Sequence, residues 1–254
     1  MPRSLHLSEF ERDFAELGAK PTHIRRLWRA WLGLASWQSQ GHASYPKALQ
    51  EKLPEIQSQL ESLARFNVKE SRQAESSKLL VMLPDGACVE AVLLPRQALC
   101  ISTQVGCAVG CAFCMTGKGG LERQLSSAEI AAQYVAATRI KPDIKKVVLM
   151  GMGEPSHNLR SVFSAVEHIV RYSGIGYKEV VISTVGDKRL FKALMESQIK
   201  PALAISLHSA MDEKRRSLLP RAAELTVKEI LEFGAKYAEV GKYPIQYQWT
   251  LING

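Results

Sequence analysis

The 254-residue sequence contains no apolar run of the roughly 18 residues that a membrane-spanning helix requires. Its apolar stretches, such as Pro201–Leu207, have the length of a strand. The opening residues, MPRSLHLSEFERDF, have no apolar core ahead of their charges and do not predict a secretory signal. Cysteine is scarce, with five residues, and three of these lie within eight positions, unlike a secreted disulfide framework. We therefore expect a soluble, cytoplasmic protein.

The composition excludes a disordered or fibrous chain, because 46% of the residues are apolar and 23% are charged, close to globular averages. The length fits one large domain, or one domain with an appendage. Lysine and arginine number 33 against 25 aspartate and glutamate residues, which gives a net charge of +8. This balance favours a polyanionic partner such as nucleic acid, although a solvated lysine face would give the same count.

Residues 1–66 have helical periodicity and are expected to form an N-terminal helical domain of the RNA-binding type. Ser8 and Glu11 have the spacing of a capping box ahead of a first helix. Thr22–Gln38 and Tyr45–Phe66 predict two further helices, on either side of a polar stretch at Gly41–Ser44. Three arginines at positions 25, 26 and 29 fit an outer helix face or an RNA contact equally well.

Residues 67–98 predict a β-hairpin extension, because two β-prone runs flank the turn sequence Asp85-Gly86. Strands and helices alternate over residues 99–254. The expected strands are Leu99–Thr103, Lys146–Met150, Glu179–Thr184, Pro201–Leu207 and Pro244–Leu251, and the expected helices are Ser126–Arg139, Asn158–Tyr172, Lys188–Ser197 and Thr226–Val240. This alternation predicts an α/β fold with a parallel sheet, open or closed as a barrel. Since the chain stops directly after a strand, we expect the C-terminal part of the core to be missing.

Three cysteines follow the first of these strands, in the spacing Cys107-x3-Cys111-x2-Cys114. A loop of this length can place one thiolate on each of three irons of a cubane cluster and leave the fourth iron open to a ligand. The alternative is a zinc site with three cysteines and either His157 or His208. No second CxxC pair is present, so the pattern favours the cluster.

Further polar residues fall at the carboxyl ends of the next strands, where α/β folds bind their ligands. The second strand is followed by Gly153 and Glu154, and the third ends at Ser183. The fourth ends in Ser206-Leu207-His208. Taken singly, a serine at a strand end is more often a cap and a histidine is often a satisfied buried residue.

The sequence contains the segments LCISTQVGCAVGCAFCMTGKGGLERQLSSAEI, VVLMGMGEPSHNL, VVISTVG and LAISLHSAMDEKRRSLLP. Together they resemble the RlmN/Cfr family of radical S-adenosylmethionine (SAM) RNA methyltransferases. The resemblance runs from about Glu90 to the last residue and more loosely through the helical part. It implies a partial (β/α) TIM-like radical-SAM barrel with an N-terminal helical cap and a β-hairpin extension.

The resemblance also implies roles for individual residues. The three cysteines, Cys107, Cys111 and Cys114, would hold a [4Fe–4S] cluster whose open iron binds SAM and yields a 5′-deoxyadenosyl radical. Contacts to SAM would come from Gly153, Glu154, Ser183, Ser206, Leu207 and His208, and the Glu154 carboxylate suits the α-ammonium of SAM. Cys100 matches a catalytic cysteine that breaks a covalent link to the methylated base, and Glu90 matches a proton acceptor. Without the resemblance, Cys100 reads as a buried strand residue and Glu90 as a solvent-facing one.

The implied function is methylation of an adenine ring carbon in 23S ribosomal RNA, with transfer RNA as a further substrate, and the Lys118-Gly-Gly loop favours carbon 2 over carbon 8. The implied partners are RNA, contacted by cations such as Lys118 and Arg123, and a reductant such as flavodoxin or ferredoxin, around a monomer. The family carries a further, methylated cysteine near its C-terminus, whereas no cysteine follows Cys114 here. The alternatives are a radical-SAM protein of the same fold with another substrate, and a non-catalytic RNA-binding protein with a cluster or zinc.

Overall fold

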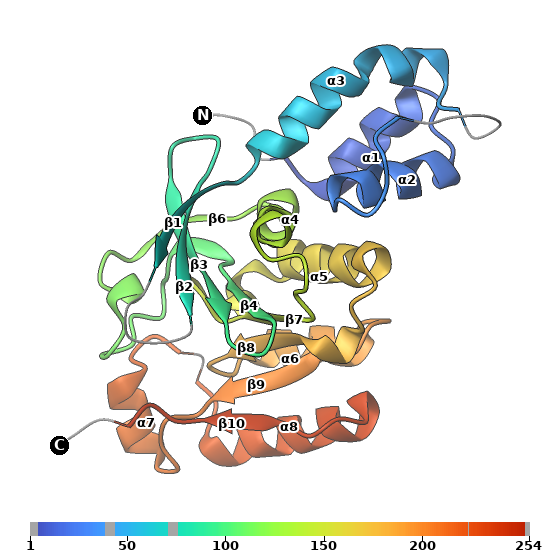
Figure 1. The fold of residues 1–254 in the computed structure, drawn as a ribbon. Coiled ribbons are helices and arrows are strands. Elements are labelled where there is room, and N and C mark those ends of the chain that lie inside the picture. Colours follow the sequence, from blue (N-terminus) through green and yellow to red (C-terminus); the bar gives the residue numbers. More distant parts are fainter. Residues whose placement is uncertain (1–4, 39–43, 71–75, 223, 252–254) are drawn as a thin grey trace.

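The computed structural model describes residues 5–38, 44–70, 76–222 and 224–251. A sheet of eight strands in the order β1-β2-β3-β4-β7-β8-β9-β10 forms its centre (Figure 1). Strands β4, β7, β8, β9 and β10 run parallel, and β1, β2 and β3 continue the same sheet in antiparallel pairing. The strands are β1 Arg65–Glu70, β2 Ser77–Met82, β3 Cys88–Leu94, β4 Ala98–Ile101, β7 Lys146–Leu149, β8 Val180–Thr184, β9 Ala202–Ser206 and β10 Gln246–Gln248. A separate two-stranded sheet pairs β5 Gln104–Gly106 with β6 Leu121–Gln124.

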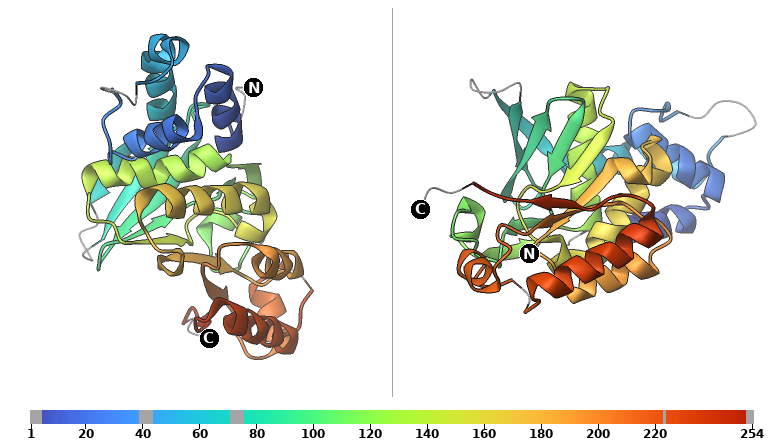
Figure 2. Two further views of the ribbon diagram at one scale, coloured as in Figure 1. Left: turned by 90° about the vertical axis from the view of Figure 1, so that its right-hand side faces the viewer. Right: turned by 90° about the horizontal axis from the view of Figure 1, so that it is seen from below.

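Helices follow the parallel strands as the alternating pattern predicts, and this confirms the α/β fold with a mostly parallel sheet. They are α4 Ser127–Ile140, α5 Leu159–Ser173, α6 Lys188–Glu196, α7 Asp212–Leu218 and α8 Val227–Gly241. Short 3-10 helices span Met115–Gly117, Pro155–Asn158 and Tyr177–Glu179. In Figure 2 (left), α4, α5, α6 and α8 follow one another along one side of the sheet. The capping box of Ser126 and Glu129 forms at the start of α4 as predicted.

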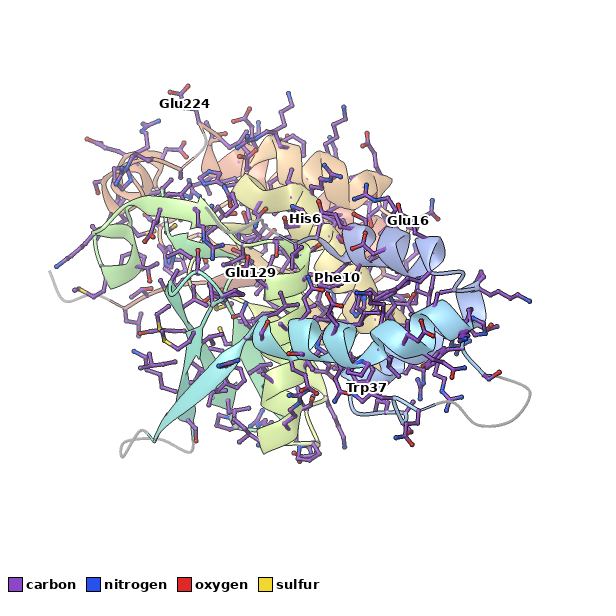
Figure 3. All side chains as sticks on the ribbon, turned by 90° about the horizontal axis from the view of Figure 1, so that it is seen from above. His6, Phe10, Glu16, Trp37, Glu129 and Glu224 are labelled. Atoms are coloured by element: carbon purple, nitrogen blue, oxygen red, sulfur yellow. The ribbon has the colours of Figure 1, made fainter. Side chains whose placement is uncertain are left out.

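Three helices precede the sheet: α1 Leu7–Glu16, α2 Pro21–Trp31 and α3 Lys47–Ser62. Their apolar faces join the same core as the sheet and α5, so the core is continuous from Leu7 to Tyr237. Figure 3 shows His6 at the start of α1, and there the Leu7 N–H donates to Ser127 Oγ of α4 at 3.0 Å. No helix in the described ranges is long and apolar enough to cross a membrane.

His168 of α5 joins the helical segment to the sheet. Its ring lies edge-on to Trp28 with centroids 4.6 Å apart, and it also contacts Trp31 and Tyr172. Only 4% of the residue is exposed, and its Nε2 has no hydrogen-bond partner in the described part of the chain. Burial, reinforced by the charge of Arg171, lowers the pKa of His168 to about 3. The junction therefore holds a neutral imidazole at neutral pH.

The structure corrects several boundaries at the N-terminus. The first capping box uses His6 and Glu9 instead of Ser8 and Glu11, because the helix begins earlier, at the buried Leu7. The second helix ends at Trp31 instead of Gln38, since Gly33 takes a positive φ of 74° and the Leu34 N–H returns to the Arg29 carbonyl at 2.8 Å.

Other differences concern short elements. The third helix ends at Ser62, and the residues around Phe66 form β1, a strand that the helical periodicity did not predict. Of the expected strand Pro244–Leu251 only β10 forms, and β5, β6 and α7 were not predicted. Residues 41–43 of the expected polar stretch and the last three residues of the chain lie outside the described ranges.

Candidate active site

A cavity of about 500 Å³ opens at the carboxyl ends of the parallel strands. Its wall contains all three clustered cysteines, Cys107, Cys111 and Cys114. It also contains the predicted strand-end residues Gly153, Glu154, Ser183, Ser206 and His208. The structure thus brings together residues that are up to about 100 positions apart in the sequence, as the rule for ligand sites in α/β folds predicts.

The cysteine loop, residues 107–114, is held by main-chain hydrogen bonds on two sides. The Cys107 N–H donates to the Gly120 carbonyl at 2.8 Å, where the β5–β6 hairpin closes. The Ala112 N–H donates to the Leu218 carbonyl at the end of α7, at 2.9 Å. Gly110 has a φ of 64°, and the Arg221 guanidinium lies against it, with Cζ 3.0 Å from the place a Cβ would occupy. The positive φ therefore favours glycine at that turn.

The thiols of the loop are free of disulfides and close enough to influence one another. Burial, reinforced by the neighbouring Cys114 and Cys107, raises the pKa of Cys111 to about 11. Burial also raises the pKa of Cys107. Thiols of this kind stay protonated until a metal displaces the proton.

The three thiols suit a cluster better than a single ion. Across the described ranges, no group of three or more His, Cys, Asp or Glu side chains is arranged to hold one metal ion. A [4Fe–4S] cluster makes a different demand, because each thiolate binds its own iron and the sulfurs remain apart. Three thiols on the wall of one cavity that also has room for a ligand fit that demand.

Glu154, which follows β7, is hydrogen-bonded to the end of β8. Only 3% of the residue is exposed. Its Oε1 accepts hydrogen bonds from the Thr184 hydroxyl at 2.6 Å and the Ser156 N–H at 3.1 Å, and its Oε2 accepts one from the Val185 N–H at 3.0 Å. Both carboxylate oxygens are thus engaged within the protein. The residue orients the carboxyl ends of β7 and β8 around the cavity.

The residue before it must be glycine. Gly153 has a φ of 104°, and a Cβ built there would lie 2.6 Å from Cβ of Gln104. Gln104 in turn accepts the Glu154 N–H on its Oε1 at 2.7 Å. The buried β5 strand therefore sets the path of the Gly-Glu segment, and the glycine main chain lines the cavity.

Ser183, Ser206 and His208 lie on the ends of β8 and β9. The two serine hydroxyls are 3.5 Å apart. The His208 Nδ1 accepts the Thr250 N–H at 3.1 Å, so the neutral ring carries its proton on Nε2. Burial, with the charge of Arg215, lowers the pKa of His208. These polar groups line the cavity from two adjacent strands.

Three predicted residues lie outside the cavity wall. Cys100 is buried in β4, where it pairs with Val92 and Val148, and burial raises its pKa to about 11. Glu90 lies on β3 in an ion pair with Lys78. Leu207 is 2% exposed. His157, considered as a zinc ligand, is likewise not on the wall.

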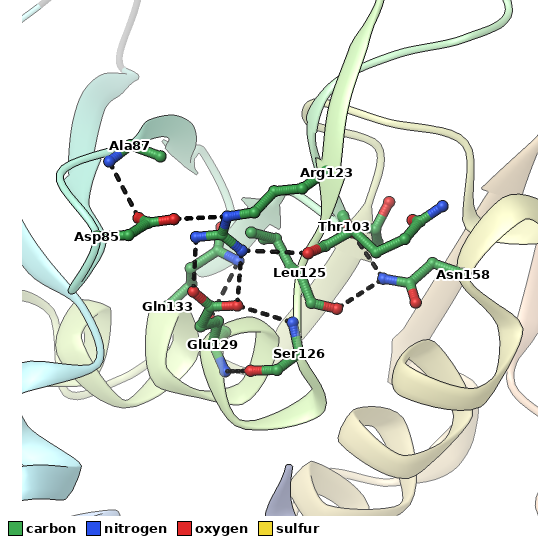
Figure 4. A network of polar contacts seen from close by, with 10 residues as sticks. Asp85, Ala87, Thr103, Arg123, Leu125, Ser126, Glu129, Gln133 and Asn158 are labelled. Carbon is green, nitrogen blue, oxygen red and sulfur yellow. Dashed lines mark hydrogen bonds and ion pairs between the residues drawn. The ribbon is translucent and has the colours of Figure 1, made fainter. Parts of the chain in front are cut away.

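Arg123 is part of an internal network instead of a free RNA contact (Figure 4). Its guanidinium donates two hydrogen bonds to the buried carboxylate of Glu129, at 2.9 and 3.1 Å, and one to Asp85 in the β2–β3 turn, at 2.7 Å. Glu129 also accepts the Ser126 N–H at 2.8 Å. The side-chain amide of Asn158 donates hydrogen bonds to the carbonyls of Thr103 and Leu125, at 2.9 and 2.8 Å. Because β6 carries Arg123, the network fixes the hairpin that bears the cysteine loop.

The cavity wall includes residues that sequence reasoning did not single out: Phe113, Thr116, Met150, Val185, Gln248, Trp249 and Thr250. Trp249 and Thr250 follow β10, so the strand-end rule could have found them. Phe113 lies within the cysteine loop and packs edge-on against His208, with centroids 4.8 Å apart. The same rule covers Met150, which directly follows β7, and Val185, which directly follows β8.

Comparison with known proteins agrees with this geometry. Residues 101–254 match the model of the radical SAM superfamily. A protein named probable RNA methyltransferase from Stutzerimonas stutzeri is 49% identical over 98% of this chain and 74% of its own length, and one from Chromobacterium violaceum is 51% identical over 98% and 72%. The crystal structure of a radical SAM methyltransferase from Sphaerobacter thermophilus superposes with a TM-score of 0.81 at 27% identity, over 99% of this chain and 76% of that one. The chain therefore belongs to the radical SAM superfamily and, within it, to the RNA methyltransferase family that its motifs resemble.

Proposed function

We propose that this protein is a radical-SAM methyltransferase that methylates an adenine ring carbon of RNA. The observation that carries the proposal is the single cavity whose wall combines the thiols of Cys107, Cys111 and Cys114 with the polar strand ends of β7, β8 and β9. An electron carrier would need a fourth protein ligand, whereas three ligands beside an open pocket suit a cluster that binds a substrate directly. Family membership supports the same chemistry.

The three cysteines are proposed to hold a [4Fe–4S] cluster. When bound, the cluster and SAM supply one-electron cleavage of the SAM sulfonium to a 5′-deoxyadenosyl radical. The protein has to orient SAM and exclude water. The Gly153 main chain, the two serine hydroxyls of Ser183 and Ser206, and His208 are proposed to bind it, with Leu207 as a buried support. Since both Glu154 oxygens are engaged by the protein, Glu154 is proposed to act mainly by holding Gly153 and Thr184 in place.

Cys100 and Glu90 are proposed to serve the base instead of SAM. Cys100 has its backbone contact at Met150, a wall residue, so it lies just beneath the cavity. A thiol there could break a covalent link to the base once it loses its proton. Glu90 is paired with Lys78 on β3, and its carbonyl accepts the Ser102 hydroxyl, which also accepts the Met152 N–H at 2.7 Å. A carboxylate on that strand is suited to proton transfer.

RNA is the proposed substrate, and the exposed cations near the cysteine loop are the proposed phosphate contacts: Lys118, Lys214, Arg216 and Arg221. Such contacts give affinity that weakens steeply with salt. The finer proposals are carbon 2 of an adenine in 23S ribosomal RNA, transfer RNA as a further substrate, flavodoxin or ferredoxin as reductant, and a cytoplasmic monomer. The proposed organisation is a helical domain at 1–66, an extension at 67–98 and the barrel core at 99–254.

The test is anaerobic purification followed by iron, sulfide and zinc analysis and incubation with SAM, dithionite and RNA. The wild-type chain should contain about four irons and four sulfides, and it should release 5′-deoxyadenosine. Cys111→Ala should do neither, while Cys88→Ala, an exposed cysteine outside the cavity, should match the wild type. Mass spectrometry of the RNA then identifies the methylated adenine. A colourless protein with about one zinc and no sulfide would refute the proposal.

A further inference from the structure

Arg215 of α7 is a buried cation that the proposed function does not yet use. Only 3% of the residue is exposed, whereas its neighbours Lys214 and Arg216 lie at the surface. Its guanidinium donates to the Val185 carbonyl, and its Nε has no hydrogen-bond partner among the described residues. Arginine is almost never fully buried unless it is paired, and an unused buried N–H is costly. We therefore expect the buried guanidinium of Arg215 to interact with a further hydrogen-bond acceptor or negative charge.

The surroundings of Arg215 connect it to the cysteine loop. The end of its helix bonds the loop through the Leu218 carbonyl and the Ala112 N–H, at 2.9 Å. The next residue, Leu219, packs in a small apolar cluster with Cys107, Val109 and Val185. Arg215 thus belongs to the layer that supports the loop from the side of α7.

The same arginine is linked to Glu154 through one residue. Val185 donates its N–H to Glu154 Oε2 at 3.0 Å and accepts the Arg215 guanidinium on its carbonyl. Arg215 interacts electrostatically with Asp212 at the start of its own helix, and also with Cys111 and Glu154. Guanidinium remains charged in proteins. A buried positive charge therefore faces a region where Glu154 is one anion and where iron binding would create three thiolates.

We propose that Arg215 is a positioning residue that supplies the buried positive charge beside the cluster and thereby raises the reduction potential of that cluster. The inference rests on the proposed function, because it needs a cluster on Cys107, Cys111 and Cys114. Reduction adds one electron, taken from an external reductant such as dithionite, to the oxidised cluster. A fixed cation stabilises the more negative, reduced state, and low-dielectric surroundings strengthen the effect. If the acceptor for Arg215 Nε is present only when the cluster is bound, this also explains why Nε has no partner among the described residues.

The experiment compares Arg215→Met, Arg215→Lys and the control Arg216→Met in the full chain under anaerobic conditions. Arg216 is the next residue of the same helix and loses the same charge, but it is exposed. Iron and sulfide are measured first. The cluster is then titrated with dithionite at a series of fixed potentials, and the paramagnetic reduced form is counted by electron paramagnetic resonance. We expect the midpoint of Arg215→Met to move to more negative potential, while Arg215→Lys and Arg216→Met stay close to the wild type.

The alternatives are separable. A loaded Arg215→Met protein with the wild-type midpoint would overturn the inference, and so would an equal shift in Arg216→Met. If Arg215→Met fails to hold a cluster, retention by Arg215→Lys supports a need for charge, whereas loss in both variants shows that only the guanidinium packing matters and overturns it. A wild-type chain without iron and sulfide would instead remove the proposed function itself.

Discussion

Replacing His168 tests the neutral imidazole at the junction between the N-terminal helices and the sheet. The pKa of this buried ring is lowered to about 3, against about 6.5 in an unfolded chain. Because the unfolded state binds the proton first, stability is fully present above pH 6.5 and is lost as the pH falls towards 3. Each unit within that window costs about 1.4 kcal/mol. Between pH 8 and pH 5 the loss amounts to about 2 kcal/mol.

The assay is urea unfolding of the wild type and His168→Phe, followed by the fluorescence of the adjacent Trp28 and Trp31. Carboxylates titrate in both proteins, so the quantity of interest is the difference between the two pH dependences. The stability lost from pH 8 to pH 5 should be about 2 kcal/mol smaller in His168→Phe, because phenylalanine takes up no proton. Equal losses in the two proteins would mean that the ring takes up its proton as readily in the folded state as in the unfolded state, and the reasoning would fail.

Further predictions concern the site and its support. Gly153→Ala should weaken SAM binding at least tenfold by equilibrium dialysis, because its Cβ would meet Gln104 at 2.6 Å, whereas Gly119→Ala, with nothing within 4 Å, should bind normally. Arg123→Leu should lower the free energy of unfolding by about 3 kcal/mol, because the buried Glu129 carboxylate loses its partner. Adding Glu129→Leu should recover part of this loss. A double variant that loses the sum of the two single losses would contradict the expectation. Trp28→Ala should cost about 3–5 kcal/mol in the same urea assay, since the side chain is fully buried against α5, and a loss under 1 kcal/mol would refute tight docking of the helices.

The sequence was sufficient for the parts of the fold whose physics is local. Alternating strands and helices, the Asp85-Gly86 turn and the box of Ser126 and Glu129 all formed as predicted, because periodicity and turn chemistry decide them. The strand-end rule also placed the cysteines and the Gly-Glu segment beside one another. These elements depend on residues that are close in sequence or on a general rule of topology.

The remaining features depend on distant contacts. Residues 65–66 continue a helical pattern, yet β1 forms because β2 offers an edge with which it pairs. Three features of the site depend on contacts between residues 30 or more positions apart. They are the burial of Arg215 against Val185, the bond of Glu154 to Thr184 and the pairing of Arg123 with Asp85. Charge alone marks these side chains as surface residues, so sequence reasoning assigned Arg123 to RNA.

The attachment of the cysteine loop has a consequence for engineering. Both of its anchoring hydrogen bonds use main-chain groups, the N–H of Cys107 and of Ala112, so neither depends on the identity of an intervening side chain. Ala112 and Met115 are exposed, Met115 to 73%, and tolerate other side chains, except that proline at 112 would remove the anchoring N–H; a side chain at Gly110 would be strained. Libraries at these exposed positions could therefore change the surface beside the cysteine loop while the sulfur-bearing scaffold keeps its form.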